Sequence, residues 1–378
     1  MRFLMLNWRE PHNPKSGGAE RVTLAYLAAL VERGHEVVWF ANDFPGAVPG
    51  EVIEGIRVVR GGGFVTSILA ARRWYRQQPR FDLVMDQHHG IPWYAPWWCG
   101  TNHIAYIHEV LGPIWNTFYP WPWNWIGRRQ ESWTHWLYRR VPFFTACEST
   151  VSCLRRHGVH HATIIRYGVN TQALPELDSK PLGQPLKLAV VSRLAPNKRI
   201  AHCLRALAAL RQRGVTATLQ VVGTGECEAA LKQEAAQLQL TDSVTFTGPL
   251  SESDKDAILR SAHFLLHTSV REGWGLNVIE ANAMGTPAAV YPVEGLIEST
   301  LHDRTGLVAA AETPLALADQ IAGVLSDDAR YQRYRRAAWD RAKTMHWSQV
   351  LPRACDWLEA RAQGAPLTGP SGQIAAGS

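Results

Sequence analysis

The chain has 378 residues and a formal net charge of +6; 46% of its residues are hydrophobic and 19% are charged. This length is too great for one ordinary core and predicts two domains, and the composition is that of a globular protein. The positive charge is compatible with an anionic partner such as a nucleotide phosphate, a nucleic acid or an acidic lipid, although a solvated basic surface is the default interpretation. The absence of any long Lys/Arg run argues against a nucleic-acid partner.

Cysteine usage and hydropathy indicate the cellular compartment. The six cysteines are scattered without a C-x-x-C pair, which argues against zinc and against a disulfide framework. The first residues, "MRFLMLNWRE", lack the long apolar stretch of a secretion signal, and no run of about 18 apolar residues could span a bilayer. We therefore expect a cytoplasmic protein, or one at the cytoplasmic face of a membrane.

The first half of the chain alternates short apolar strands with longer amphipathic helices, the pattern of parallel α/β units. The predicted strands are "RFLMLNW", "EVVWFAND", "IRVVRGG", "FDLVMDQ" and "HIAYIHEV". A helix over "GGAERVTLAYLAALVERGH" follows the first strand, and "FFTACEST" and "ATIIRYG" complete a first domain over 1–170.

Residues 171–187 contain three prolines without apolar periodicity and predict an interdomain linker. A second α/β series over 188–350 begins with strand "LKLAVVSRL" and helix "IAHCLRALAALRQRG", continues through "TATLQVVGTG", "CEAALKQEAAQL", "SVTFTGPL" and "SESDKDAILRSA", and reaches strand "HFLLHTS". We predict that a helix over 351–364 returns to the first domain and that the Gly/Pro/Ser-rich residues 365–378 are disordered. Two doubly wound parallel sheets would then face a cleft with their carboxyl ends, where such sheets bind ligands.

Glycines and cations follow several predicted strands. Gly17 and Gly18 would let backbone N–H groups approach a phosphate or sugar at a helix start, although this signal is weak alone and a plain strand-to-helix turn explains it better. Arg193 and Lys198 close the first strand of the second domain and could neutralise a diphosphate, or lie in a solvated loop. Other tight turns or main chain at strand ends could contact a ligand at Gly223, Phe246 and Gly248.

The stretch "REGWGLNVIEANAMGTP" is the most informative segment of the chain. It predicts a turn and a helix after a buried strand, with Glu272 in the turn and Glu280 inside the helix. The N–H groups of the first helical turn are suited to an anion, and they belong to Gly275, Leu276 and Asn277.

An ordered succession of motifs then supports a family resemblance. The motifs are "SGGAERV", "IHE", "CESTV", "IIRYGVN", "SRLAPNKRI", "VVGTGE", "TFTGPL", the E-x7-E of Glu272 and Glu280, "MGTPAAVYPVEGLIE" and "DRTGLV". In these the chain resembles retaining, nucleotide-sugar-dependent glycosyltransferases of family 4. The resemblance implies the GT-B fold: two Rossmann-like doubly wound α/β domains that face a cleft.

The resemblance also implies roles for individual residues. Glu272 would bind hydroxyls of the donor sugar and Glu280 the ribose, while Arg193 and Lys198 would hold the diphosphate and His108 would lie near donor sugar and acceptor. Of these, Glu272, His108, Arg193 and Lys198 would be the catalytic set. The remaining positions would contact the donor, mostly through main chain: Gly17, Gly18, Gly223, Phe246, Gly248, Gly275, Leu276 and Asn277.

The implied reaction moves a hexose from GDP-mannose or a UDP-sugar to a glycan or lipid-linked acceptor, by front-face displacement with retention. It requires no cofactor beyond the nucleotide sugar and no metal. The alternatives are a nucleotide-sugar epimerase of the same fold and a non-catalytic sugar- or lipid-binding protein. Departures from the family pattern leave the donor open, and they lie at Tyr167, Arg199, Trp274, Asn277 and Glu294.

Two features resemble metal sites. The histidines of "HHG" and "HGVHH" lack a completing carboxylate or cysteine pair, so they do not form a recognisable ligand set. The D-x-D of Asp254 and Asp256 follows Ser251 at a predicted helix start, where N-capping explains the acidic residues better than Mn²⁺ does. We therefore predict no metal site.

Nine of the sixteen tryptophans lie between Trp93 and Trp136. The segment "YPWPWNW" contains two prolines and predicts an irregular loop. Aromatic rings beside arginines suit a membrane interface or lipid-linked acceptor, stacking on a soluble sugar, or filling of the core. We assign the membrane or acceptor role to Trp121, Trp123, Trp125, Arg128 and Arg129.

Overall fold

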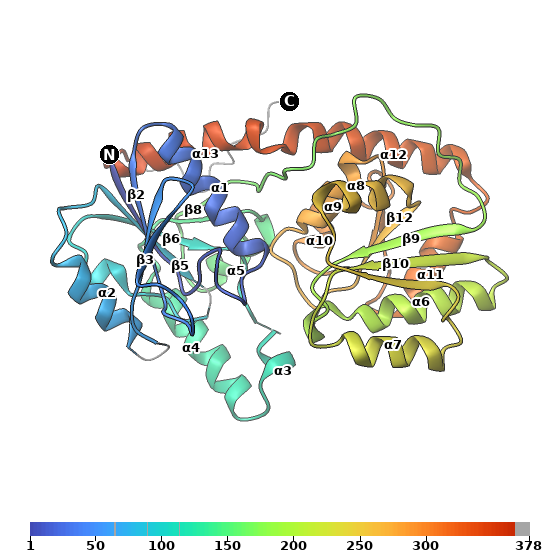
Figure 1. The fold of residues 1–378 in the computed structure, drawn as a ribbon, viewed down its shortest axis with the longest axis horizontal. Helices are drawn as coiled ribbons and strands as arrows, with labels where there is room; N and C mark the ends of the chain where they lie inside the picture. Colours follow the sequence, from blue (N-terminus) through green and yellow to red (C-terminus); the bar gives the residue numbers. More distant parts are fainter. Residues whose placement is uncertain (64–65, 89, 113, 367–378) are drawn as a thin grey trace. The chain divides into compact units, whose positions relative to one another are not determined.

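The computed structural model describes residues 1–63, 66–88, 90–112 and 114–366, and Figure 1 shows their fold. The chain divides into two compact units. Unit 1 contains Met1–Trp115, Tyr119–Gly168 and the segment that starts at Trp347; unit 2 contains Asn116–Phe118 and Val169–His346.

The described residues of unit 1 form one eight-stranded sheet in the order β3-β4-β2-β1-β5-β6-β7-β8. All neighbouring strands are parallel except β3 and β4, an antiparallel pair at the edge. The strands are β1 (Arg2–Leu6), β2 (Glu36–Ala41), β3 (Gly50–Ile53), β4 (Ile56–Arg60), β5 (Leu83–His88), β6 (Asn102–Ile107), β7 (Phe143–Thr145) and β8 (Ala162–Ile164).

Helices cover both faces of this sheet. Against one face, Tyr26 of the first helix packs edge-to-face on Tyr106 and Phe144, and Trp357 of the last helix packs on Phe144. The opposite face buries two apolar clusters under the remaining helices. The helical segments of unit 1 are α1 (Gly18–Glu32), α2 (Ser67–Tyr75), η1 (Ala95–Trp97), α4 (Trp123–Leu137), α5 (Glu148–Arg156) and α13 (Trp347–Ala362). Helix α3 (Ile114–Phe118) crosses the division between the units.

The described residues of unit 2 form a six-stranded parallel sheet in the order β11-β10-β9-β12-β13-β14. This is the doubly wound order, in which the order of the strands reverses between β9 and β12. The strands are β9 (Leu186–Val191), β10 (Ala217–Val222), β11 (Val244–Gly248), β12 (Phe264–His267), β13 (Ala288–Val290) and β14 (Gly306–Val308).

In unit 2, helices α6, α7 and α11 lie on one side of the sheet and α8, α9 and α12 on the other (Figure 1). The bounds of its helical segments are η2 (Pro196–Lys198), α6 (Ile200–Gln212), α7 (Glu228–Gln237), α8 (Glu252–Ser261), α9 (Leu276–Ala283), α10 (Leu296–Ser299), α11 (Pro314–Ala322), α12 (Asp328–Ala342) and η3 (Lys343–Met345).

The two α/β sheets confirm the predicted fold class, and the quoted apolar runs form the expected strands. Ser251 is the N-cap of α8 and accepts a hydrogen bond from the N–H of Asp254, as expected. The predicted linker belongs to unit 2, and of the residues predicted to be disordered, 367–378 lie outside the described part.

One predicted element is wrong. The segment "YPWPWNW" is not an irregular loop throughout, because α4 begins at Trp123. Pro122 precedes the helix as its N-cap, and a proline at a helix start removes no intrahelical hydrogen bond. The antiparallel edge strand β3 and the helices α2 to α4 were not predicted either.

Candidate functional site

The loops after β9 and β12 meet at the point where the strand order of unit 2 reverses. The N–H of Val270 donates to the carbonyl of Asn197 at 2.8 Å, and the hydroxyl of Thr268 donates to the carbonyl of Lys198 at 3.2 Å. These contacts bring two predicted site residues together, with Lys198 Nζ 2.7 Å from Glu272 Oε2. Parallel sheets bind ligands at this position.

The carboxylate of Glu272 is held by three donors. Besides Lys198, His267 Nε2 lies 3.1 Å and Ser269 Oγ 3.2 Å from the same oxygen, Oε2. Burial alone would raise the pKa of Glu272, but the ammonium of Lys198 and the ring of His267 outweigh it and hold this pKa well below its usual value. Glu272 is therefore ionised throughout the neutral range.

Arg199, where the family has a frequent glycine, lies in the left-handed region with φ 49°. Its guanidinium donates to the carbonyl of Thr268 at 2.7 Å and to that of Ser269 at 2.6 Å. The side chain that replaces the glycine therefore joins the Lys198 loop to the turn that leads to Glu272.

Helix α9 begins directly after this turn. Gly275 is its N-cap with φ 84°, a conformation that favours glycine. Because the helix starts here, the first-turn N–H groups of Leu276 and Asn277 have no carbonyl partner one turn earlier. The side-chain amide of Asn277 donates to the carbonyl of Val191 at 2.8 Å, which ties the helix start to the end of β9.

Glu280 lies on α9 and has a lysine partner of its own. Lys255 Nζ of helix α8 lies 3.1 Å from Glu280 Oε1, and the Lys255 side chain is only 8% exposed. Burial lowers the pKa of Lys255, but the carboxylates of Glu280 and Glu252 together outweigh this and leave it raised. Within the described residues no hydrogen bond joins Glu280 to Glu272, and each carboxylate has its own lysine partner.

The other predicted site residues of unit 2 lie within its strands or directly after them. Arg193 is exposed and has no ion-pair partner within the described part of the chain. The N–H of Gly223 donates to the carbonyl of Gly248 at 2.9 Å, and a Cβ on Gly223 would collide with the carbonyl of Ser192. The ring of Phe246 lies 5.8 Å from Lys232 Nζ.

In unit 1, the hydroxyl of Tyr167 lies 2.7 Å from His108 Nδ1, and His108 is 8% exposed. A tyrosine hydroxyl that donates to Nδ1 leaves the hydrogen of a neutral ring on Nε2. Tyr167 is a departure from the family's usual asparagine, and the structure places it on the predicted site histidine.

Gly17 and Gly18 lie at the start of α1. The N–H of Gly17 donates to Glu20 Oε2 at 2.7 Å, so this group already has an acceptor. A Cβ on Gly17 would meet only Glu20 Oε2, at 3.8 Å, and its φ of −152° is ordinary extended backbone. The fold of unit 1 therefore does not itself require glycine at position 17.

The tryptophan-rich segment presents most of its rings to solvent. Trp121, Trp123 and Trp125 are 81%, 63% and 55% exposed, and Arg128 and Arg129 are exposed beside them on α4. The guanidinium of Arg129 lies 5.5 Å from the ring of Trp125. Trp93, by contrast, is 0% exposed, so part of the tryptophan belt does fill the core.

One cluster among the described residues has metal-ligand geometry, made of Glu10, His12 and Glu51. The guanidinium of Arg60 forms ion pairs with both Glu10 and Glu51, and it supplies the positive charge that a metal would bring. No helix in the described ranges is long and apolar enough to cross a membrane.

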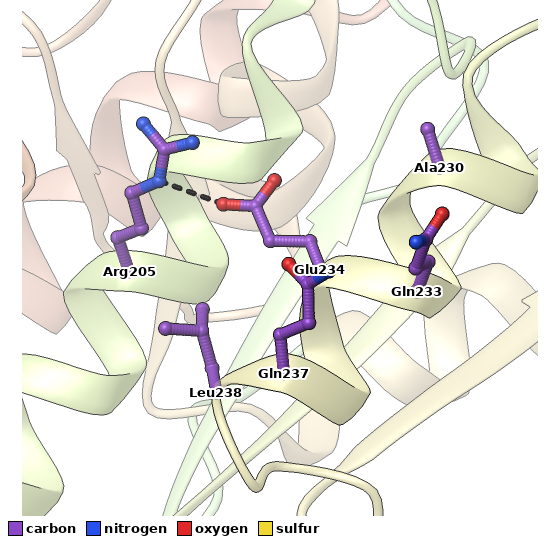
Figure 2. A pocket seen from close by; sticks show the side chains of 6 residues that line it. All are labelled: Arg205, Ala230, Gln233, Glu234, Gln237 and Leu238. Carbon is purple, nitrogen blue, oxygen red and sulfur yellow. Dashed lines mark hydrogen bonds and ion pairs between the residues drawn. The ribbon is translucent and has the colours of Figure 1, made fainter.

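A surface hollow of unit 2 lies between α6 and α7, away from the strand ends. Figure 2 shows Arg205 of α6 reaching Glu234 of α7, with Nε and Oε1 2.7 Å apart. Its lining contains none of the predicted site residues: Arg205, Ala230, Gln233, Glu234, Gln237 and Leu238.

Sequence profiles match both halves of the chain. The family described as "Glycosyltransferase Family 4" matches residues 16–173, and "Glycosyl transferases group 1" matches residues 178–341. This protein is a family 4 glycosyltransferase.

Curated relatives of this glycosyltransferase include the glycogen synthase of Mycobacterium tuberculosis, 26% identical over 93% of this chain and 92% of that protein. The D-inositol 3-phosphate glycosyltransferase of Corynebacterium glutamicum is 30% identical over 50% of this chain and 47% of that protein. The 2-deoxystreptamine glucosyltransferase of Streptomyces kanamyceticus is 34% identical over 38% of this chain and 37% of that protein.

Solved structures share its GT-B fold. Sucrose-phosphate synthase of Thermosynechococcus elongatus aligns with a TM-score of 0.79 at 18% identity, over 96% of this chain and 100% of that chain. HepE of Anabaena, solved with UDP-glucose, aligns with a TM-score of 0.71 at 18% identity, over 95% and 100% of the two chains.

Sequence reasoning missed the partners of the predicted carboxylates. His267 and Ser269 were assigned only to a strand end, and Lys255 only to a helix. A histidine at the end of the otherwise apolar strand "FLLH" is the one signal that could have marked the first pair.

Proposed function

We propose that this glycosyltransferase transfers a hexose from a nucleotide diphosphate sugar to a glycan or lipid-linked acceptor with retention of configuration. The observation that carries the proposal is the contact of Lys198 with Glu272 at the strand reversal of unit 2, beside the start of α9. The UDP-glucose complex of HepE supports a nucleotide-sugar donor, and UDP-sugars and GDP-mannose are the candidates.

The charges of unit 2 suit the parts of such a donor. Arg193, Lys198 and the first-turn N–H groups of α9 would bind the diphosphate, Glu272 the sugar hydroxyls and Glu280 the ribose. Because protein cations would neutralise the diphosphate, we propose that transfer needs no metal and no further cofactor.

Retention is proposed to occur without a covalent intermediate. The C1–oxygen bond to the departing phosphate breaks while the acceptor oxygen bonds to C1 on the same face, and the acceptor proton passes to the phosphate oxygen. Glu272 is a poor nucleophile and base because three donors hold one of its oxygens and its pKa is low. Catalysis then rests on positioning and electrostatic stabilisation.

The test begins with thermal unfolding in the presence of UDP-, GDP- and ADP-sugars. The true donor at about a hundred times its Kd should add about 2.7 kcal/mol to the free energy of unfolding. Transfer of radiolabelled sugar from that donor to lipid-linked and soluble acceptors, with and without chelator, then tests the reaction and its metal independence.

Failure of every nucleotide sugar to bind would overturn the proposal. Conversion of the donor to another sugar without any acceptor, followed by NMR, would instead indicate an epimerase, which none of the relatives above supports. Donor binding without transfer to any acceptor would favour the non-catalytic alternative.

We infer further that α4 rests on an anionic lipid surface, which would place the enzyme at the cytoplasmic face of a membrane. Its exposed side carries Trp125, Arg129, Trp133 and Trp136 at helical spacing. The one carboxylate of α4, Glu131, is buried and accepts N–H groups from Leu111, Gly112 and Trp115. The outer side is therefore aromatic and cationic, which suits the interface of an anionic bilayer.

Vesicle co-sedimentation tests this surface. The triple variant Trp121→Ser, Trp123→Ser, Trp125→Ser should lose binding to phosphatidylglycerol vesicles, whereas the control Leu315→Ser, at a 59% exposed position of unit 2, should retain it. Unchanged binding by the triple variant would refute the membrane role. Loss of transfer to a soluble acceptor, without any vesicle binding by the wild type, would favour sugar stacking.

A further inference from the structure

The carboxylate of Glu272 is bonded asymmetrically. All three of its donors reach the same oxygen, Oε2: Lys198 Nζ at 2.7 Å, His267 Nε2 at 3.1 Å and Ser269 Oγ at 3.2 Å. Within the described residues Oε1 has no hydrogen-bond partner, and the side chain is 20% exposed. One oxygen is thus anchored to the protein and the other is available to a ligand.

His267 is the buried member of this anchor. It is the last residue of β12, is 6% exposed, and its Nε2 also lies 2.9 Å from Ser269 Oγ. A carboxylate can only accept hydrogen bonds, so Nε2 must carry a hydrogen. Nδ1 is buried without a partner in the described part of the chain, so the ring makes its side-chain hydrogen bonds through Nε2 alone.

The position of His267 explains why a histidine is useful there. Strand β12 is central to the sheet and pairs with β9 and β13, so its last residue is held by the parallel ladder. A side chain fixed in this way can restrain the turn that follows the strand. Lys198 cannot supply this restraint alone, because its flexible stem would also have to serve the diphosphate.

We propose that His267 is a positioning residue for sugar transfer: it anchors Glu272 through Oε2 so that Oε1 faces a hydroxyl of the donor sugar. The inference rests on the proposed function of unit 2. His267 itself touches neither nucleotide nor sugar in this role and acts only through Glu272.

Substitution of His267 separates this role from general support of the fold. His267→Leu removes the donor without leaving a buried polar group, whereas His267→Gln can place an amide N–H near the position of Nε2. His267→Asn is the matched control, because its shorter amide does not reach that position. The measurements use the free enzyme with UDP or GDP, and with the nucleotide sugar that the wild type turns over.

We expect kcat to fall about tenfold or more in His267→Leu and His267→Asn, and to recover at least in part in His267→Gln, as for a hydrogen bond to a charged group. The Kd of the nucleoside diphosphate, measured by calorimetry, should stay within about twofold of the wild type, because Glu272 would contact only the sugar. In a Glu272→Ala background, His267→Leu should cause no further change in the affinity for the nucleotide sugar, because the carboxylate that His267 anchors is already absent.

Wild-type kcat in a folded His267→Leu variant would overturn this inference and leave the proposed function standing. Equal loss of nucleoside diphosphate and nucleotide-sugar affinity would also overturn it, since that outcome indicates a purely structural role. If His267→Leu does not fold, the contrast between Gln and Asn decides. A wild-type enzyme that binds and turns over no nucleotide sugar would overturn the proposed function and this inference with it.

Discussion

The ionisable side chains at the carboxyl ends of the two sheets differ in their exposure to solvent. In unit 2, Glu272 and Lys198 form an ion pair whose side chains are 20% and 21% exposed. In unit 1, the groups at and beside the end of β5 are buried: Asp86 is 0%, His88 3% and His135 2% exposed. Burial raises the pKa of Asp86 to about 6 and lowers that of His135 to about 3.

This difference in exposure suits the end of the unit 2 sheet to ligand binding and the end of β5 in unit 1 to packing. Ionised groups that are paired yet accessible can exchange a protein partner for a phosphate or a hydroxyl, as expected of a donor site. Groups that are buried among aromatic rings, such as His88 against Tyr138 and Phe143, hold a fixed packing instead. The charged chemistry of this enzyme is therefore expected to reside in unit 2.

The largest expected effect comes from the cations of unit 2. Lys198→Ala or Arg193→Ala should lower kcat by about 10²–10³-fold, because each removes a charge that stabilises the departing diphosphate. The measurement is steady-state transfer with the donor found above. Arg205→Ala, an exposed arginine of the α6–α7 hollow, is the matched control and should keep wild-type turnover. Near-normal turnover in both test variants would remove the assignment of a diphosphate site.

The next effect separates the two glutamates within unit 2. Glu272→Gln should lower kcat by about 10–150-fold with nucleoside diphosphate affinity retained, since the change weakens the sugar contact and the contacts with the three donors of Oε2. Glu280→Gln should instead weaken nucleoside diphosphate binding by about tenfold, because it loses the charge proposed to bind ribose. Kinetics and calorimetry on both variants test this division; the same pattern in both would argue against separate roles.

The sequence predicted the strands, turns and helices of the two units better than the side-chain contacts between these elements. Apolar strands, glycine turns and the helix after Glu272 follow from local periodicity and turn chemistry, so both sheets could be expected. The contact of Lys198 with Glu272 joins residues 74 positions apart, and only the resemblance suggested that they share a site.

The partners of the site residues were beyond sequence reasoning for a physical reason. Periodicity indicates which face of an element is buried, but not which polar side chain of one element reaches another. His267, Lys255 and Tyr167 each act across such a contact. Helix α4 was missed because its tryptophans and Pro122 have weak helix propensity, and the burial of Glu131 on its inner side was not visible.

The smallest effect concerns the buried groups of unit 1 and appears in stability rather than turnover. The lowered pKa values of His88 and His135 mean that below about pH 6.5 the unfolded state binds more protons than the folded state. Each histidine therefore makes the free energy of unfolding rise with pH, by up to about 1.4 kcal/mol per pH unit. Asp86 acts oppositely: between about pH 4 and 6 it keeps a proton in the folded state that the unfolded state has lost, so its contribution falls as pH rises.

Urea unfolding between about pH 4 and 6 can separate these opposing contributions by their slopes. His135→Leu should flatten the rise of the free energy of unfolding with pH, and Asp86→Asn should steepen it, whatever the absolute stability of either variant. Leu315→Ser, which changes an exposed residue without a titratable group, should leave the slope unchanged. Equal slopes in all four proteins would mean that the end of β5 ionises like a solvated surface, and the contrast between the two sheets would then no longer hold.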